Sequence, residues 1–322
     1  MEGIWYNPGI MKRLIMFMAA AAVASATASQ APDLSGVFPE DVKTVGIVAM
    51  SSVIPTKTFN AGTNALTKAG YRLKVMPNVP EQTVATPERR ARLFEEAWLD
   101  PEIDLILFAR GGQGAIDVVD KVDWEKLRKR DMRVIGFSDV TLVVNTMLAK
   151  KAGHPYTGPM LSSFTKAHPV AFKRIHDMLA GVPKDVKLKA LKPGAGTVKG
   201  LAMGGLLERL HRLSERDWLP DTAGRVIFIE NTNKYADRAD ELLGGLAKKG
   251  VFDKAAAVVI CDFNSKEPKA ETAALLKRFA DSVACPVFTG FQYGHIGDSS
   301  LIDFRRELTI TPDGTLSWKQ GN

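Results

Sequence analysis

Apolar and amphipathic stretches alternate along the chain after residue 40. Apolar runs of strand length occupy 44–50, 72–76, 103–109 and 134–136 in the first half. Between them, helical patterns run from 58 to 69 and from 86 to 99, the latter begun by a threonine N-cap and a first-turn proline. Strands and helices alternating at this spacing predict βαβ units and a parallel sheet, which binds ligands at the carboxyl ends of its strands.

The second half of the chain continues this alternation with longer helical patterns. Strand-like runs occupy 225–230, 255–261 and 286–290, and helical patterns occupy 142–152, 168–180, 206–214, 236–249 and 271–282. The tail, from 307 to 318, reads as a β-hairpin around Pro312-Asp313-Gly314. A lysine-rich stretch with prolines and glycines, 182–199, predicts a linker, and residues 200–205 (GLAMGG) predict a glycine loop.

These patterns predict an α/β protein of two domains. We expect a parallel sheet flanked by helices, Rossmann- or flavodoxin-like, within residues 29–165. A helix and linker occupy 166–199, and a smaller mixed α/β domain occupies 200–322. The chain of 322 residues, 45% of them hydrophobic, is long enough to give each domain its own core.

The first 28 residues differ in character from the rest. Met11-Lys12-Arg13 is basic, residues 14–23 are apolar and rich in alanine, and Ala26-Thr27-Ala28 has the small-x-small pattern of a cleavage site. We therefore expect residues 1–28 to be a signal peptide, translation to start at Met11, and the mature protein to be periplasmic. One alternative is that the apolar run stays in the mature protein as a membrane anchor. The other is that residues 1–28 are not a signal peptide, in which case the protein is cytoplasmic.

The charge pattern indicates which partners to expect, and the cysteine content indicates whether disulfides form. The formal net charge is +7, but basic and acidic residues alternate, as from Asp120 to Arg133, which is typical of a solvated surface. Nucleic acid is therefore not an expected partner. Cys261 and Cys285 lie in apolar strand-like runs, so we expect buried free thiols, with a single disulfide as the alternative in an exported protein.

No metal, cofactor or nucleotide is expected from the motifs. The five histidines lack metal-ligand spacing, and there is no cysteine cluster. The glycine-rich stretch Arg110-Gly111-Gly112-Gln113-Gly114 follows a predicted strand but lacks the lysine of a P-loop, and no acid stands where a dinucleotide fingerprint needs one.

A candidate nucleophile lies at the end of the fourth predicted strand, in Val134-Ile-Gly-Phe-Ser-Asp-Val-Thr141. Ser138 sits between strand and helix, where a hydroxyl is exposed and the helix N-terminus offers free N–H groups. Val140 occupies the place of the second glycine in the G-x-S-x-G motif, so the match to that motif is incomplete. Taken alone, Ser138 is better explained as a helix N-cap than as a nucleophile.

Two further residues complete a possible triad. Glu230 ends a predicted strand, and His295 follows another between a glycine and Ile296. A solvated carboxylate and an ordinary surface histidine are the alternatives for each alone. Together with Ser138 they supply nucleophile, orienting acid and base in the order Ser, Glu, His.

From about Val45 to Leu308 the chain resembles the serine LD-carboxypeptidases, the murein tetrapeptide carboxypeptidases. The motifs that carry the resemblance fall in the family's order and approximate spacing. They are Arg110–Ala115 (RGGQGA), Gly136–Thr141 (GFSDVT), Gly158-Pro159-Met160, Gly204-Gly205, Ile229-Glu230 and Gly294-His295.

The resemblance implies a triad of Ser138, Glu230 and His295 between the two domains, with backbone N–H groups near Gly112 and Asp139 as the oxyanion hole. It implies a serine carboxypeptidase that releases the terminal D-alanine of murein stem peptides, without a cofactor, and a homodimer. The family's recycling enzymes work in the cytoplasm, so the expectation of export rests on residues 1–28 alone. Such an enzyme needs a cation for the terminal carboxylate, for which the candidates are Arg110, Lys234 and Arg238.

The chain departs from the family pattern at three places, none of them in the triad. Leu206 and Asn231 replace polar and acidic residues expected to line the pocket, and the segment 296–300 lacks the proline and glycine that the family usually has before its last strands. An immunity-type serine peptidase with the same triad and another substrate is therefore an alternative. The rival from another class is an exported two-domain protein that binds solutes or wall peptides without catalysis.

Overall fold

The computed structural model describes residues 32–165, 168–216, 218–232, 236–263 and 269–321. The predicted signal peptide, residues 1–28, lies outside these ranges. In the part of the chain that is described, no helix combines the length and apolar character that crossing a membrane requires.

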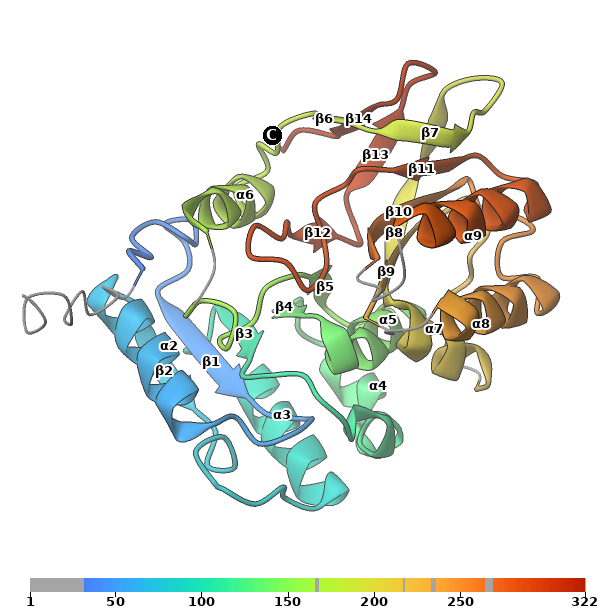
Figure 1. The fold of residues 1–322 in the computed structure, drawn as a ribbon. Helices are drawn as coiled ribbons and strands as arrows, with labels where there is room; N and C mark the ends of the chain where they lie inside the picture. The colour runs from blue at the N-terminus through green and yellow to red at the C-terminus, as the bar shows by residue number, and fades with distance from the viewer. Residues whose placement is uncertain (1–31, 166–167, 217, 233–235, 264–268, 322) are drawn as a thin grey trace, which may run out of the picture. The chain divides into compact units, whose positions relative to one another are not determined.

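The first sheet has six strands in the order β12-β5-β4-β3-β1-β2 (Figure 1). These are β1 (Thr44–Val48), β2 (Arg72–Val75), β3 (Leu105–Phe108), β4 (Arg133–Gly136), β5 (His154–Thr157) and β12 (Ile302–Asp303). Strands β1 to β5 pair in parallel, and β12 pairs antiparallel with β5. Every residue of β1 and β3 is buried, as expected for central strands of a parallel sheet.

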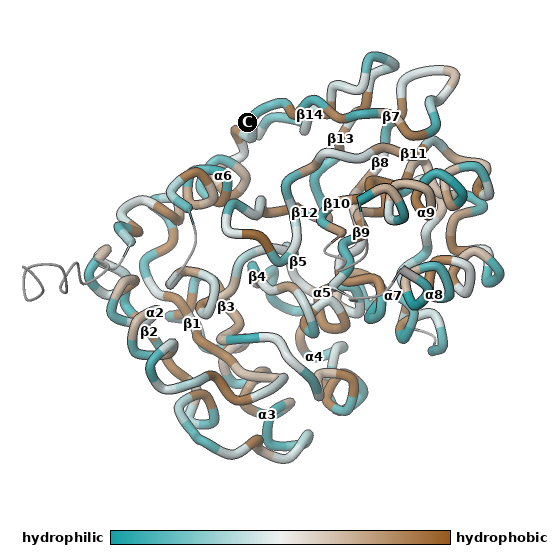
Figure 2. The backbone as a smooth tube through the Cα atoms, viewed as in Figure 1, coloured by the Kyte–Doolittle hydropathy of each residue, from teal (hydrophilic) through white to brown (hydrophobic). Residues whose placement is uncertain are grey.

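The helices of this half follow the strands in the predicted alternation. They are α2 (Thr56–Lys68), α3 (Pro87–Leu99), α4 (Trp124–Leu127), α5 (Thr141–Ala149) and α6 (Pro169–Leu179). The Thr86 hydroxyl accepts a hydrogen bond from the Arg89 N–H and caps α3, as predicted. Figure 2 shows apolar positions concentrated in the central strands and hydrophilic ones on outer helices and loops.

The second sheet has eight strands in the order β6-β14-β13-β8-β9-β10-β11-β7. They are β6 (Val186–Lys187), β7 (Lys189–Lys192), β8 (Val198–Leu206), β9 (Val226–Asn231), β10 (Ala257–Phe263), β11 (Val287–Thr289), β13 (Glu307–Ile310) and β14 (Thr315–Trp318). Strands β8 to β11 are parallel, and the other pairings are antiparallel. Helices α7 (Leu207–Ser214), α8 (Ala236–Lys248) and α9 (Lys269–Ser282) group beside this sheet (Figure 1).

The predicted fold class is confirmed: a parallel sheet is joined to a second, mixed sheet. Two local expectations are corrected. Residues 182–199 form β6, β7 and the start of β8 rather than an unstructured linker, and residues 200–205 lie within strand β8 rather than in a loop. Cys261 and Cys285 are both buried free thiols.

The double glycine of β8 allows close packing on both sides of the strand. A Cβ on Gly204, whose φ is +130°, would lie 1.9 Å from the Phe228 carbonyl oxygen on β9. A Cβ on Gly205 would lie 2.5 Å from the Thr141 hydroxyl at the start of α5. Glycine is therefore required here by the close approach of β9 and α5.

Buried polar contacts fasten α5 to β8. The Asn145 amide donates to the Gly204 carbonyl at 2.9 Å and accepts from the Gly204 N–H at 3.2 Å. The Thr141 hydroxyl accepts from the Leu206 N–H at 3.1 Å. Because Thr141 and Asn145 are fully buried, these bonds fix the second sheet relative to the turn that precedes α5.

Candidate active site

Ser138 lies in a tight turn between β4 and α5, in the 3₁₀ segment Ser138–Val140. Its φ is +62°, a left-handed conformation that costs an L-residue about 1 kcal/mol or more. The preceding Phe137 is extended, and α5 begins at Thr141. The structure thus gives Ser138 the strained strand-to-helix turn typical of a nucleophilic serine.

The glycine-rich loop after β3 packs directly against this turn. A Cβ on Gly111 would lie 2.9 Å from the Ser138 Oγ and 3.3 Å from the Asp139 nitrogen. A Cβ on Gly112 would lie 2.3 Å from the Ser52 hydroxyl, which accepts the Gln113 N–H at 3.0 Å. The loop can approach the serine this closely because both positions lack side chains.

The three predicted triad residues meet in space. The Ser138 Oγ lies 3.1 Å from His295 Nε2, and His295 Nδ1 lies 2.7 Å from Glu230 Oε2. With its proton on Nδ1, the imidazole donates to the carboxylate and accepts from the serine hydroxyl. This arrangement can deprotonate the serine and stabilise the imidazolium that results.

The pKa shifts of Glu230 and His295 fit a general base that is held by a buried acid. Glu230 is fully buried, and burial raises the pKa of its carboxyl, which the His295 hydrogen bond lowers only in part. Burial acts to lower the pKa of His295, but the hydrogen bond and charge of Glu230, with Asp262, raise it overall. His295 keeps 32% of its side-chain surface exposed, so a substrate can reach its face.

The loop that carries His295 is held at both ends. The Tyr293 hydroxyl lies 2.6 Å from the Thr157 hydroxyl at the end of β5, and both residues are fully buried. The Gly294 N–H donates to the Ser299 hydroxyl at 3.1 Å, and the Ser300 N–H donates to the Gln292 carbonyl at 2.7 Å. The segment that departs from the family pattern therefore supports the histidine.

Close packing also fixes Gly294. A Cβ at this position would lie 2.8 Å from Glu230 Oε2 and from the Asp262 side chain. The Phe137 ring also packs against the imidazole, with ring centroids 4.8 Å apart. His295 is thus held by the Phe137 ring and the Glu230 carboxylate while its Nε2 faces Ser138.

The two predicted oxyanion donors lie next to the nucleophile and are not used elsewhere. Among the described residues, neither the Gly112 N–H nor the Asp139 N–H has a hydrogen-bond acceptor. Unpaired N–H groups beside a nucleophile are the elements from which an oxyanion hole is built. The Asp139 carboxylate is buried and bonded elsewhere, to Ser51, Ala115 and Arg209.

The three candidate cations for a substrate carboxylate differ in their surroundings. Arg110 is half-buried, and its Nη1 donates to the Val53 carbonyl at 2.8 Å in the loop after β1. Arg238 is exposed on α8 and pairs with Glu241 at 2.6 Å, with no contact to the triad. Lys234 lies outside the described residues.

The two pocket substitutions noted in the sequence are buried. Leu206 is 5% exposed and Asn231 1%. Leu206 follows the double glycine and packs at the start of α7, while Asn231 ends β9 directly after Glu230.

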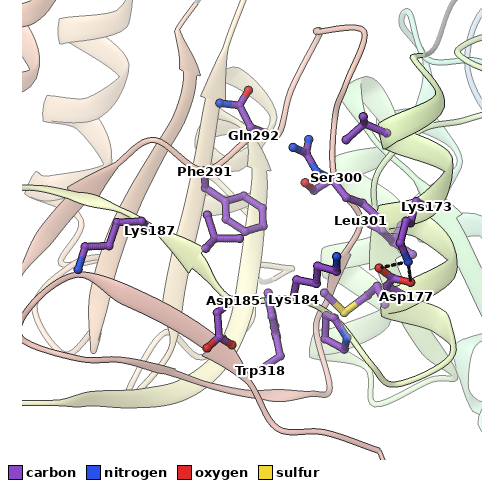
Figure 3. Close-up of a pocket in the computed structure, with 15 residues that line it drawn as sticks. Lys173, Asp177, Lys184, Asp185, Lys187, Phe291, Gln292, Ser300, Leu301 and Trp318 are labelled. Atoms are coloured by element: carbon purple, nitrogen blue, oxygen red, sulfur yellow. Dashed lines mark hydrogen bonds and ion pairs between the residues drawn. The ribbon is translucent and has the colours of Figure 1, made fainter.

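A separate cavity of about 460 Å³ lies between α6 and the second sheet. Figure 3 shows Phe291, Leu301 and Trp318 on its walls and the Lys173–Asp177 ion pair at one side. No triad residue lines it. Gln292 and Ser300, which close the base of the His295 loop, border the cavity.

Sequence reasoning missed several residues that support the site. Asn145, Arg209 and Tyr293 are polar or charged side chains, and the structure buries all three. Arg209 carries the one visible signal, because it lies among Leu206, Leu210 and Leu213 on the apolar side of its helix. A charge in that position indicates a buried partner, but the pattern does not say which one.

Comparison with known proteins places both halves of the chain in one family. The LD-carboxypeptidase N-terminal domain matches residues 45–157, and the LD-carboxypeptidase C-terminal domain matches residues 199–310. A Bacillus subtilis relative with the name "Probable murein peptide carboxypeptidase" is 25% identical over 80% of this chain and 86% of its own. The microcin C7 self-immunity protein MccF of Escherichia coli is 23% identical over 82% of this chain and 90% of its own.

Solved structures share the fold. The muramoyltetrapeptide carboxypeptidase from Oxalobacter formigenes aligns with a TM-score of 0.78 at 23% identity, over 87% of this chain and 99% of that one. MccF in complex with glutamyl sulfamoyl guanosine aligns with a TM-score of 0.77 at 21% identity, over 90% and 99%.

Proposed function

The chain belongs to the LD-carboxypeptidase family, and we propose that it is a serine carboxypeptidase that releases the terminal D-alanine of murein tetrapeptides. The observation that carries the proposal is the Ser138–His295–Glu230 chain of contacts, at 3.1 and 2.7 Å, beside two N–H groups without acceptors. A carboxypeptidase hydrolase is the activity expected of the family.

In the proposed reaction the Ser138 Oγ attacks the carbonyl carbon of the bond between the L-centre of the diamino acid and D-alanine. His295 Nε2 takes the serine proton, and Glu230 holds the imidazole by its Nδ1–H. The N–H groups of Gly112 and Asp139 bind the oxyanion, each contributing roughly 3 kcal/mol or a factor of 10² to 10³ in rate. His295 then gives the proton to the departing amine, and water hydrolyses the acyl-enzyme.

A cation is needed for the carboxylate of the terminal D-alanine. We propose Arg110, because it directly precedes the glycine-rich loop that touches Ser138. Its Nη1 already donates to the Val53 carbonyl, so the remaining guanidinium nitrogens are the ones offered to the substrate.

The function is tested with paired peptides. Purified protein is incubated with murein tetrapeptides that carry lysine or diaminopimelate before a terminal D-alanine, and with the same peptides ending in L-alanine. Release of D-alanine alone supports the proposal. Tight binding of the tetrapeptide without release would instead identify a wall-peptide-binding protein.

A second substrate class follows from the similarity to MccF, whose solved complex holds glutamyl sulfamoyl guanosine. The same triad could cleave the amide bond of an aminoacylated nucleoside. An aminoacyl sulfamoyl nucleoside is therefore included in the assay, and its hydrolysis in place of the tetrapeptide would assign an immunity-type activity.

If His295 is the general base, its protonation should determine how kcat/KM falls at low pH. Protonated His295 cannot accept the serine proton, so kcat/KM should rise with pH through the pKa of His295 in the free enzyme. Because Glu230 and Asp262 raise that pKa, the midpoint should lie above the usual value of about 6.5. A profile of kcat/KM between pH 5 and 9 measures it, and a midpoint clearly below 6 would contradict this electrostatic assignment.

We also propose that the protein is exported and acts in the periplasm on wall stem peptides. The basic, apolar and small-residue pattern of residues 1–28 is the support for this. Cell fractionation with N-terminal sequencing is the test, and a cytoplasmic protein that begins at Met11 would refute the proposal.

A further inference from the structure

A buried arginine from the second half of the chain reaches the nucleophile turn. Arg209 lies on α7 with 8% of its side chain exposed, and its Nε donates to Asp139 Oδ1 at 2.6 Å. Asp139 follows Ser138 directly, and 2% of its side chain is exposed. The ion pair therefore joins α7 to the residue whose N–H is a proposed oxyanion donor.

The Asp139 carboxylate is the centre of a larger network. Its Oδ2 accepts from the Ser51 hydroxyl at 2.7 Å and from the Ala115 N–H at 2.9 Å. These partners belong to the loops after β1 and β3. With Arg209, three separate segments converge on one carboxylate, which leaves the backbone of Asp139 little freedom.

The same guanidinium also holds the second oxyanion segment. Arg209 Nη2 donates to the Gly112 carbonyl at 3.1 Å, and the N–H of the same peptide unit, that of Gln113, donates to Ser52. The peptide that follows Gly112 is thus bonded on both sides. These bonds restrain the backbone on the carboxyl side of Gly112, whose φ is +114°, and so help to set the direction of the Gly112 N–H.

We propose that Arg209 is a positioning residue that sets the spacing and direction of the two oxyanion donors, Gly112 and Asp139. It touches neither the substrate nor the reacting atoms and acts through the two backbone segments that it bridges. The inference rests on the proposed serine mechanism and adds to it a residue from α7.

Arginine is suited to this position in a way that lysine is not. Two nitrogens at a fixed angle reach a carboxylate and a carbonyl at once, whereas an ammonium on a flexible stem offers one compact point charge. Arg209→Lys preserves the charge beside Asp139 but cannot reproduce both contacts. It therefore separates neutralisation of the buried carboxylate from geometric control of Gly112.

The variants are Arg209→Lys and Arg209→Ala, with Arg212→Lys as a matched control on the same helix. Arg212 is exposed and pairs with Glu208, which also lies 3.1 Å from Arg209 Nη1; among the described residues Arg212 makes no hydrogen bond to Asp139. For D-alanine release we expect kcat of Arg209→Lys to fall by about 10²-fold, as when one oxyanion donor is lost, while KM stays within about threefold. The kcat of Arg209→Ala should fall further and recover in part with millimolar guanidinium, and the kcat of Arg212→Lys should match that of the parent.

Thermal melting identifies variants that fail to fold, and Arg209→Lys keeps the test available if Arg209→Ala unfolds. A folded Arg209→Lys with unchanged kcat would overturn the proposal, as would a loss confined to KM. If the parent protein releases no D-alanine, the proposed function fails. In that case the positioning role of Arg209 is tested by comparing the rates at which a fluorophosphonate labels Ser138 in the parent and in Arg209→Lys, because that reaction needs the same N–H donors.

Discussion

Replacing Ser138 with alanine is expected to lower kcat for D-alanine release by about 10⁴- to 10⁶-fold. The change removes the oxygen that lies 3.1 Å from His295 Nε2 and leaves no other hydroxyl in contact with that nitrogen among the described residues. The oxyanion donors and the substrate contacts would remain, so some acceleration over water should persist.

The measurement must separate loss of chemistry from loss of fold. Both serine and alanine carry a Cβ, so the cost of the left-handed φ of +62° is shared and the melting temperature should change little. Ser282→Ala, at the end of α9, serves as the matched control and should keep full activity. A folded Ser138→Ala protein that still releases D-alanine at more than a tenth of the parent rate would exclude a serine mechanism.

Replacing Glu230 with glutamine is expected to lower kcat by about 10³- to 10⁴-fold. Glutamine has the shape of glutamate but can present an N–H to His295 Nδ1, which would favour the tautomer that cannot accept the serine proton. The imidazolium would also lose its counter-charge. Stability should be unchanged or higher, because Glu230 is fully buried, burial raises its pKa, and its Oε1 has no hydrogen-bond partner among the described residues.

Asp262 provides the control for that variant. Its Cβ packs against Gly294, and its carboxylate acts on His295 through charge, without a hydrogen bond to the imidazole. Asp262→Asn should therefore leave kcat within about fivefold of the parent and move the acid limb of the pH profile downward. Equal losses in the two variants would show that charge, rather than orientation of the imidazole, is what Glu230 contributes.

Much of the first sheet could be predicted because strands β1 to β4 each carry a local signal. Strands β1 and β3 are buried on both faces and read as unbroken apolar runs, and the capped start of α3 at Thr86 marks a helix boundary. Predictions failed where the signal depends on a distant partner. Strand β12 has two residues and exists only because it pairs with β5.

The prediction also failed at the glycines of β8, because their role in the strand depends on residues far away in the sequence. Gly204 and Gly205 favour a loop locally, yet the strand needs them because β9 and α5 leave no room for a Cβ. The residues of the candidate site fall into the same two groups, those with a local sequence signal and those without one. Ser138, Glu230 and His295 follow apolar runs and could be found, whereas Arg209 and Tyr293 act through contacts that no local pattern encodes.

The distances along the chain between triad members have a consequence for the newly made protein. Ser138 and His295 are 157 positions apart, and Glu230 and His295 are 65 apart, so no short segment contains even two of the groups. Contacts of this sequence separation form only when most of the chain has condensed. An unfolded precursor is therefore inert as a peptidase, and a chain exported in that state would gain its hydrolytic activity only in the compartment where it folds.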